Sequence, residues 1–152
     1  QREQFTWKFI GGNSKNYINE ISKLGFIKPN SIQFIEHLSQ EELSKHIQKA
    51  HVCVSFSNYE TFGITMTEAI ACGTFVISTK TGILAEMANE DFFTSIPIGD
   101  EKALLHEIIQ QKNNTKTFDS KLMHQYILQK FSPKVIANQF SKIYLQTLKK
   151  HT

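Results

Sequence analysis

The chain has 152 residues, of which 40% are hydrophobic and 20% are charged, as in an ordinary soluble globular domain with a sizeable core. The net charge is +3, and the 17 basic residues are scattered rather than gathered into a groove, so we expect no nucleic-acid partner. No apolar run approaches the roughly 18 residues that span a membrane, and we expect no signal peptide in residues 1–152.

Short segments rich in β-branched and aromatic residues alternate along the chain with helical patterns. The segments of strand length are residues 7–10, 32–35, 52–56, 75–78 and, more weakly, 92–96. Three of the helical patterns place apolar residues on one face, at Tyr17, Ile21 and Leu24, at Leu43, Ile47 and Ala50, and over residues 104–109. This alternation predicts an α/β fold, a Rossmann-like parallel sheet covered by helices.

The chain after residue 112 is predicted to form two closing C-terminal helices. The first has four apolar residues that we expect to face inward, Leu122, Met123, Tyr126 and Ile127. The second begins at Ser132-Pro133, because proline is tolerated in the first turn of a helix. It carries an apolar stripe formed by Ile136, Phe140, Ile143, Tyr144 and Leu148.

Two helices are predicted to begin with the same signature, a capping box. Ser39 is followed three residues later by Glu42, and Thr65 is followed three residues later by Glu68. Thr65 is therefore expected to be the N-cap of a helix that ends near Gly73, with Glu68 as its third residue. The amides of this helix start would form a positive end that suits an anion.

Glu60 and Glu68 have seven residues between them, most of which are small or apolar. Glu60 follows the predicted strand at 52–56, and ligands of open parallel sheets bind beyond the carboxyl ends of the strands. In the plainest interpretation, Glu60 is a solvated loop residue and Glu68 only caps its helix. Beside an anion site, however, two carboxylates would accept hydrogen bonds from hydroxyl groups, which fits a diphosphate flanked by a sugar and a ribose.

The stretch SNYETFGITMTEAIACGTFVIST, residues 57–79, resembles the donor-site motif of the group 1 retaining glycosyltransferases with the GT-B fold. The matching positions are Ser57, Glu60, Phe62, Gly63, Glu68, Ala69, Ala71, Gly73 and Val76. Segments 7–12, 31–57 and 131–148 resemble other parts of the same domain, so the resemblance covers nearly the whole chain. It implies the C-terminal half of a GT-B fold.

The resemblance implies a role for each matching residue. Glu60 is expected to be catalytic, because its counterpart meets hydroxyl groups of the transferred sugar near the reacting centre. Glu68 is expected to hold the ribose. The other donor-binding residues that it implies are Gly11 and Gly12 in a glycine turn, Leu38 beside the base, and Phe62, Gly63, Ile64 and Thr65 beside the sugar and the distal phosphate.

The implied reaction is the transfer of a sugar from a UDP- or GDP-sugar to a glycan, lipid or other hydroxyl acceptor, as in polysaccharide biosynthesis. In such retaining enzymes the acceptor hydroxyl is thought to attack from the side of the leaving group, and the diphosphate helps to take its proton. The sequence has no Asp-x-Asp pair to hold a cation against a diphosphate, so we expect neither a metal ion nor another cofactor.

The sequence departs from the family pattern at several positions. Glu36 replaces the glycine before the base-contacting residue, and Phe75 replaces the proline of the motif. Of the family's Gly-Gly-x-Pro-Glu loop, only Gly82 and Glu86 remain, and we interpret Glu86 as a supporting residue. The diphosphate-binding Arg and Lys of the family would lie before Trp7.

The family's first strand and helix in this domain, and its N-terminal acceptor domain, would also precede this sequence. We therefore expect residues 1–152 to be one nucleotide-sugar-binding domain, a fragment of a two-domain enzyme that is inactive alone. Its partners would be the nucleoside-diphosphate sugar, the acceptor and the acceptor domain of the same polypeptide. The sheet would then lack a strand between those at Trp7 and Val52.

Cys53 and Cys72 lie inside apolar segments, and we interpret them as buried and reduced, which fits a cytoplasmic location. We interpret the weakly basic end, residues 149–151, as a solvated helix end, and a peripheral contact with the inner face of the membrane is the alternative. Two alternative functions also stay open. One is a non-catalytic Rossmann-like interaction domain, and the other is a phosphorylase or sugar-nucleotide epimerase on the same fold. Binding of a nucleoside diphosphate would separate an enzyme from an interaction domain.

Overall fold

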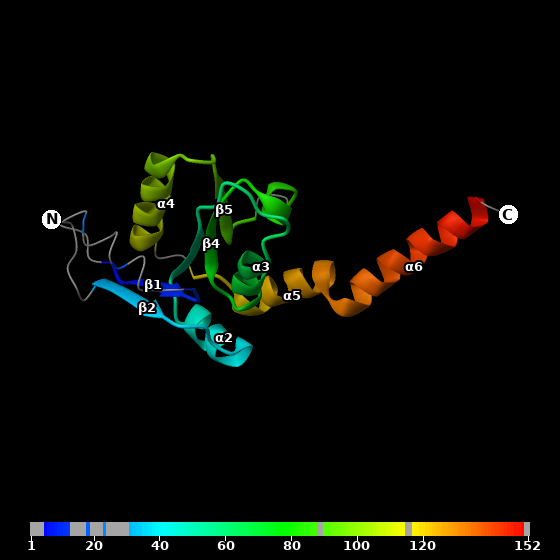
Figure 1. The fold of residues 1–152 in the computed structure, drawn as a ribbon, viewed down its shortest axis with the longest axis horizontal. Helices are drawn as coiled ribbons and strands as arrows, with labels where there is room; N and C mark the ends of the chain where they lie inside the picture. The colour runs from blue at the N-terminus through cyan, green and yellow to red at the C-terminus, as the bar shows by residue number, and fades with distance from the viewer. Residues whose placement is uncertain are drawn as a thin grey trace. The chain divides into compact units, whose positions relative to one another are not determined.

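The structure is a computed structural model that describes residues 5–12, 18, 23, 31–87, 90–114 and 117–150. The chain forms two compact units, residues 1–46 and 47–152, and each is described by itself. Figure 1 shows the elements in chain order, from blue at the N-terminus to red at the C-terminus. The predicted helical face of Tyr17, Ile21 and Leu24 falls outside the described residues.

The first unit contains a two-stranded parallel sheet, formed by β1 (Trp7–Ile10) and β2 (Ile32–Ile35). Both strands lie at the predicted positions. The aromatic rings of Phe9 and Phe34, which are register partners, stack with their centroids 5.2 Å apart. The amide of Gly11 extends the pairing by donating to the carbonyl of Ile35 at 3.0 Å.

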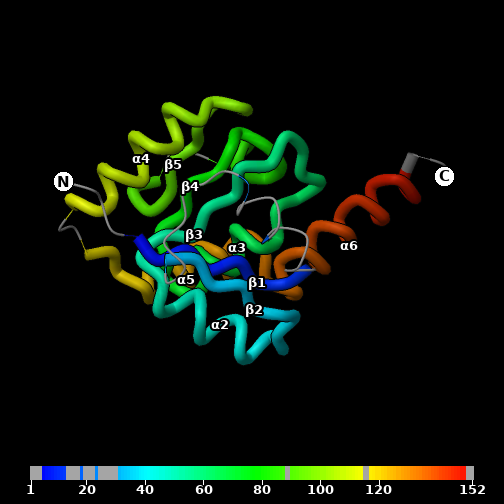
Figure 2. The backbone as a smooth tube through the Cα atoms, turned by 60° about the vertical axis from the view of Figure 1, so that its left-hand side comes forward, coloured from blue at the N-terminus to red at the C-terminus, as the bar shows by residue number. Residues whose placement is uncertain are grey.

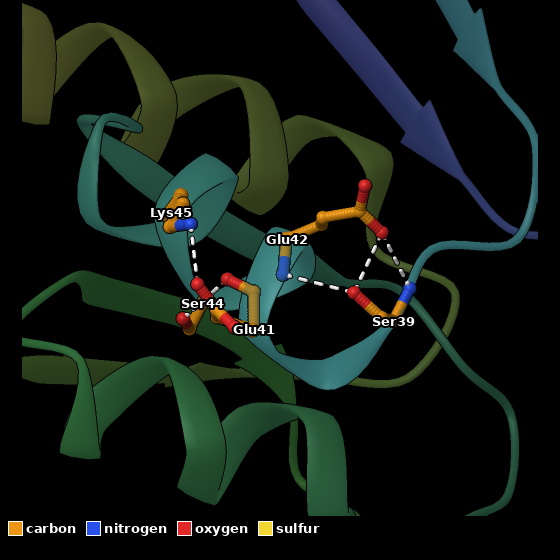
Figure 3. Close-up of polar contacts among 5 residues, drawn as sticks. All are labelled: Ser39, Glu41, Glu42, Ser44 and Lys45. Atoms are coloured by element: carbon orange, nitrogen blue, oxygen red, sulfur yellow. Dashed lines mark hydrogen bonds and ion pairs between the residues drawn. The ribbon is translucent and has the colours of Figure 1, made fainter.

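Helix α2 (Gln40–Gln48) begins with the predicted capping box, which is confirmed (Figure 3). The Glu42 carboxylate accepts hydrogen bonds from the amide and the hydroxyl of Ser39, at 3.0 and 2.6 Å. In return, the Glu42 amide donates to the Ser39 hydroxyl at 3.3 Å. These hydrogen bonds from Ser39 lower the pKa of Glu42 below its ordinary value of 4.5.

The second unit is built on a three-stranded parallel sheet with the strand order β3-β4-β5. Its strands are β3 (Val52–Ser55), β4 (Phe75–Thr79) and β5 (Phe93–Ile96). Every residue of the central strand β4 is buried, as expected for a parallel strand that is covered on both faces. The strands were predicted at these positions, with ends that differ by one residue.

Helices cover both faces of this sheet. Helix α4 (Glu101–Asn113) lies on one side of β4 and β5, while α3 (Ile64–Ala71) and α5 (Ser120–Phe131) pack together on the other side (Figure 2). The 3-10 helix η2 (Gly82–Ala85) follows β4. The core lies between these layers and includes Met66, Ala69, Ile70, Val76, Ile77, Leu84, Ile108, Met123 and Ile127. The predicted α/β class with helices on a parallel sheet is confirmed.

Both cysteines are free and only partly exposed. Burial raises the pKa of the Cys53 thiol to about 11, and the neighbouring Cys72 adds to this effect. Burial also raises the pKa of Cys72, with a smaller contribution from the Glu68 carboxylate. Both side chains are therefore protonated thiols at neutral pH, which makes them poor nucleophiles.

The two closing helices are present, as α5 and α6 (Pro133–Lys150). The prediction that Leu122 faces inward is wrong, because 62% of it is exposed while Met123 beside it is buried. The apolar stripe of α6 is also exposed from Phe140 onward. Helical periodicity places these residues on one face of each helix, but it does not say what covers that face.

Among the described residues, no helix is long and apolar enough to cross a membrane.

Candidate functional site

A loop follows β3 at its carboxyl end and leads to the start of α3. In this loop the hydroxyl of Ser57 donates to the Oε1 atom of Glu60 at 2.9 Å. The hydroxyl of Ser55, the last residue of β3, lies 3.2 Å from that of Ser57. Glu60 is partly buried. The carboxylate is therefore held in one orientation by a serine of its own loop, at the edge of the sheet where ligands of α/β proteins bind.

The neighbouring strand fixes the same loop from the other side. Thr79, the last residue of β4, donates its hydroxyl hydrogen to the carbonyl of Ser57 at 2.6 Å. Thr79 has no exposed surface. A buried hydrogen bond of this kind is short and well formed, and its loss would leave the Ser57 carbonyl without this donor.

A third anchor is provided by η2. The amide of Ile83 donates to the carbonyl of Phe62 at 2.8 Å. Gly82 has a φ of +55°, and a Cβ at this position would lie 2.6 Å from the Phe62 carbonyl oxygen and 3.1 Å from the Cβ of Glu60. Only glycine allows this approach without displacing the backbone. The Gly82 that remains from the family loop thus supports the Glu60 loop.

The start of α3 differs from the prediction. The N-cap is Gly63, with a φ of +90° and a ψ of +46°, and no side chain caps the helix. The prediction that Thr65 is the N-cap is therefore wrong, because the chain turns into the helix at Ile64 and Thr65 is already the second helical residue. The left-handed conformation that begins this helix is easily adopted by glycine.

The remaining predicted residues of this helix occupy its first two turns. Ile64 and Thr65 are exposed, and their amides belong to the first turn, where helix amides have no acceptor within the helix. Glu68 is partly buried on the second turn. The exposed amide end is thus next in sequence to the loop that holds Glu60.

The other three predicted donor-binding residues lie in the first unit. Gly11 and Gly12 follow β1 and are exposed, with φ values of +86° and +80°. A Cβ on either glycine would have no atom of the described chain within 4 Å. Leu38 is partly buried in the segment between β2 and α2. Both glycines thus adopt the left-handed backbone conformation that glycine readily takes up, directly after the end of β1.

Four residues that hold Glu60 or its loop were not among the predicted site residues. Ser55 and Thr79 end their strands, Ser57 was noted only as a matching motif position, and Gly82 only as a surviving family glycine. Among the described residues, no group of three His, Cys, Asp or Glu side chains is arranged to hold a metal ion. Two hollows, of about 430 and 410 Å³, lie beside α4 and beside Phe92 and α5, and neither is lined by the Glu60 loop.

Comparison with known proteins identifies the class of this α/β domain. The chain is similar in fold to sucrose-phosphate synthase from Thermosynechococcus elongatus, with a TM-score of 0.77 and 25% identity over 94% of this chain and 38% of that one. It is also similar to HepE from Anabaena in complex with UDP, with a TM-score of 0.71 and 19% identity over 95% of this chain and 42% of that one. A structure of HepE with UDP-glucose matches with a TM-score of 0.69 and 20% identity, over 95% and 42% of the two chains.

These matches confirm the predicted GT-B type of architecture. Residues 1–127 match the model of the family described as glycosyl transferases group 1. The chain therefore belongs to the group 1 glycosyltransferases. It spans less than half the length of the solved structures named above. No curated protein sequence matches it.

Proposed function

We propose that this chain is the donor-binding part of a retaining glycosyltransferase that takes its sugar from a nucleoside-diphosphate sugar. The observation that carries this proposal is the Glu60 carboxylate, which Ser57 holds at the carboxyl end of β3 directly before the amide end of α3. A carboxylate accepts hydrogen bonds from sugar hydroxyl groups, and helix amides favour phosphate. The sugar and the diphosphate of such a donor would therefore each have a suitable binding group, and these two groups are neighbours in the chain.

Within this proposal each residue has one task. Glu60 accepts hydrogen bonds from hydroxyl groups of the transferred sugar, and the backbone of Phe62, Gly63, Ile64 and Thr65 faces the sugar and the distal phosphate. Glu68 binds the ribose. In the first unit, Gly11 and Gly12 approach the donor and Leu38 the base. No residue of the chain is assigned as a metal ligand, because the helix amides meet the phosphate charge.

UDP-glucose is the first donor to test, since structures of HepE contain UDP and UDP-glucose. GDP-sugars are the alternative. We further propose that a second domain of the same polypeptide binds the acceptor, a glycan or a lipid, because the similar structures are more than twice as long as this chain. The protein would act in the cytoplasm, free or at the inner face of the membrane.

A nucleotide titration tests the donor site. UDP, GDP and UDP-glucose are added to isotopically labelled protein, and amide signals are followed by NMR. We expect shifts at residues 62–68 and near Leu38, at millimolar or lower concentrations. Adenosine diphosphate at the same concentrations controls for unspecific phosphate binding. Shifts confined to another surface at saturating UDP and GDP would refute the proposed donor site.

Substitution of the two glutamates separates their roles. Glu60→Ala should lower turnover of the full-length enzyme by roughly 10- to 100-fold, because a hydrogen bond to a charged group is lost at the reacting sugar. Glu68→Ala should mainly raise the Kd for the donor. Steady-state kinetics and calorimetry with UDP-glucose measure both effects. Equal and small effects of both substitutions would favour a non-catalytic interaction domain.

A further inference from the structure

The backbone ladder between β3 and β4 ends one residue before the buried Thr79. Its last register pair is Ser55 with Ser78. Beyond this pair, the Thr79 hydroxyl donates to the Ser57 carbonyl at 2.6 Å, although the two residues are 22 positions apart. A side chain of β4 thus continues the cross-strand pairing into the loop that carries Glu60.

The hydrogens of the hydroxyl groups around this contact have a defined direction. A serine hydroxyl has a single hydrogen, and that of Ser57 points to Oε1 of Glu60 at 2.9 Å. Ser55 must therefore be the donor in its 3.2 Å contact with the Ser57 hydroxyl. The result is a chain from Ser55 through Ser57 to Glu60, in which each hydrogen bond polarises the next.

The hydroxyl chain engages only one oxygen of the carboxylate. Within the described part of the molecule, Oε2 of Glu60 takes part in no hydrogen bond. The backbone on either side of Glu60 is held by Thr79 at Ser57 and by Ile83 at Phe62. Among the residues that the structure describes, the fixed loop therefore presents one carboxylate oxygen that accepts from Ser57 and one that accepts from no neighbour.

We propose that Thr79 is a positioning residue for Glu60. Its hydrogen bond fixes the Ser57 peptide, so the Ser57 hydroxyl stays on Oε1 and leaves Oε2 to accept a hydrogen bond from a sugar hydroxyl of the donor. The inference rests on the proposed donor site and adds to it a residue that does not touch the ligand. Without the Thr79 hydroxyl, the carboxylate would lose its orientation while the amide end of α3 would be unchanged.

The test compares Thr79→Val, Thr79→Ser and Thr74→Val in the full-length protein. Thr74 is a matched control, because it is buried directly before β4 and donates to the Ile47 carbonyl at 2.7 Å. Valine keeps the shape of threonine but removes the hydroxyl, and serine restores it. Thr74→Val therefore reports the effect of losing a buried hydrogen bond without a contact to the Glu60 loop.

Two measurements distinguish positioning from a general loss of stability. The first is the ¹³C chemical shift of the Glu60 side-chain carboxyl, which needs no ligand. It should change in Thr79→Val, return toward the wild-type value in Thr79→Ser and stay unchanged in Thr74→Val. The second is the ratio of the Kd for UDP to that for UDP-glucose. This ratio should fall about tenfold in Thr79→Val alone, because the sugar contact weakens while UDP binding is kept.

A Glu60 carboxyl signal that is the same in Thr79→Val and in the wild type would overturn the inference. So would equal losses of the affinity ratio in Thr79→Val and Thr74→Val. If the wild-type protein binds UDP-glucose no better than UDP, the proposed sugar contact of Glu60 fails. The carboxyl signal still decides the role of Thr79 in that case, so the two failures are distinct.

Discussion

Helices α2 and α3 start in opposite ways, although both begin near a Ser/Thr-x-x-Glu signature. At α2 the Glu42 carboxylate accepts a hydrogen bond from the Ser39 amide, and the Ser39 hydroxyl accepts one from the Glu42 amide. At α3 no side chain caps the helix, and Gly63 starts it with its backbone alone. The first arrangement makes a stable helix end that is closed to ligands. The second leaves amides exposed, as an anion site requires.

A helix end whose amides bind a ligand cannot also have those amides saturated by its own side chains. Its stability must come from elsewhere. At α3 it comes from the loop before the helix, which Thr79 and Ile83 hold by hydrogen bonds to the carbonyls of Ser57 and Phe62. The consequences of this contrast can be tested at both helix starts.

The largest effect on stability is expected for Gly82→Ala, because its new side chain would contact the loop before α3. The new Cβ would lie 2.6 Å from the Phe62 carbonyl oxygen. Together with the unfavourable φ of +55°, this overpacking should lower the free energy of unfolding by about 2–4 kcal/mol. Chemical denaturation followed by circular dichroism measures the change.

Gly99→Ala is the matched control for this substitution. Gly99 has a φ of +75°, but a Cβ there would meet no atom of the described chain within 4 Å. Gly99→Ala should therefore lower the free energy of unfolding only through its unfavourable φ, by about 1–2 kcal/mol. If both variants lose the same free energy of unfolding, the Cβ added at position 82 does not clash with the Phe62 carbonyl, and this close approach does not require glycine.

An intermediate effect is expected for Ser39→Ala at the start of α2. Loss of the capping hydroxyl should lower the hydrogen-exchange protection of the first-turn amides by roughly 2- to 30-fold. Ser44→Ala is the control, since the Ser44 hydroxyl donates to the Glu41 carbonyl within the helix and does not cap its start. If Ser44→Ala lowers protection as much, the capping box has no special role.

The same capping box predicts a pH dependence of α2. Hydrogen bonds from Ser39 lower the pKa of Glu42 in the folded chain, so the stabilisation is present above the ordinary value of 4.5 and is lost as the pH falls through the lowered value. Amide protection of α2 should therefore decrease in acid in the wild type. In Ser39→Ala this decrease should be weaker, and an identical pH profile would contradict the assignment.

The smallest effect is expected for Thr65→Ala, because Thr65 does not cap α3. The free energy of unfolding should change by less than about 0.5 kcal/mol, as for other exposed positions. Thr67→Ala provides the contrast, because the buried Thr67 donates to the Ile64 carbonyl at 2.8 Å and should lose about 1 kcal/mol. A loss above 1 kcal/mol for Thr65→Ala would restore the capping interpretation.

Local patterns in the sequence predicted the strands and the α2 cap, because both depend on residues that are near neighbours. They failed at Thr65, where the same pattern competes with Gly63, whose left-handed conformation starts the helix two residues earlier. The role of Thr79 was not predictable in this way. Its partner Ser57 lies in the loop after another strand, β3, and nothing in the local sequence specifies that contact.

The family motif, in contrast, predicts a donor site at the Glu60 loop, because a motif records residues that act together rather than residues that form one element. Of the groups that orient the carboxylate, the matching motif positions include Ser57 but not Ser55 or Thr79. Ser55 contacts the Ser57 hydroxyl from the end of β3, and Thr79 contacts the Ser57 carbonyl from the end of β4. Side-chain positioning of this kind requires the three-dimensional structure.

The order β3-β4-β5 also has a consequence for how the second unit folds. Each strand pairs with the one that follows it in the sequence, so every ladder closes a loop that contains little more than one helix or turn. Closing a short loop costs less conformational entropy than closing a long one. The pairing of these strands, which sets the two sides of the Glu60 loop, therefore does not depend on joining distant parts of the chain.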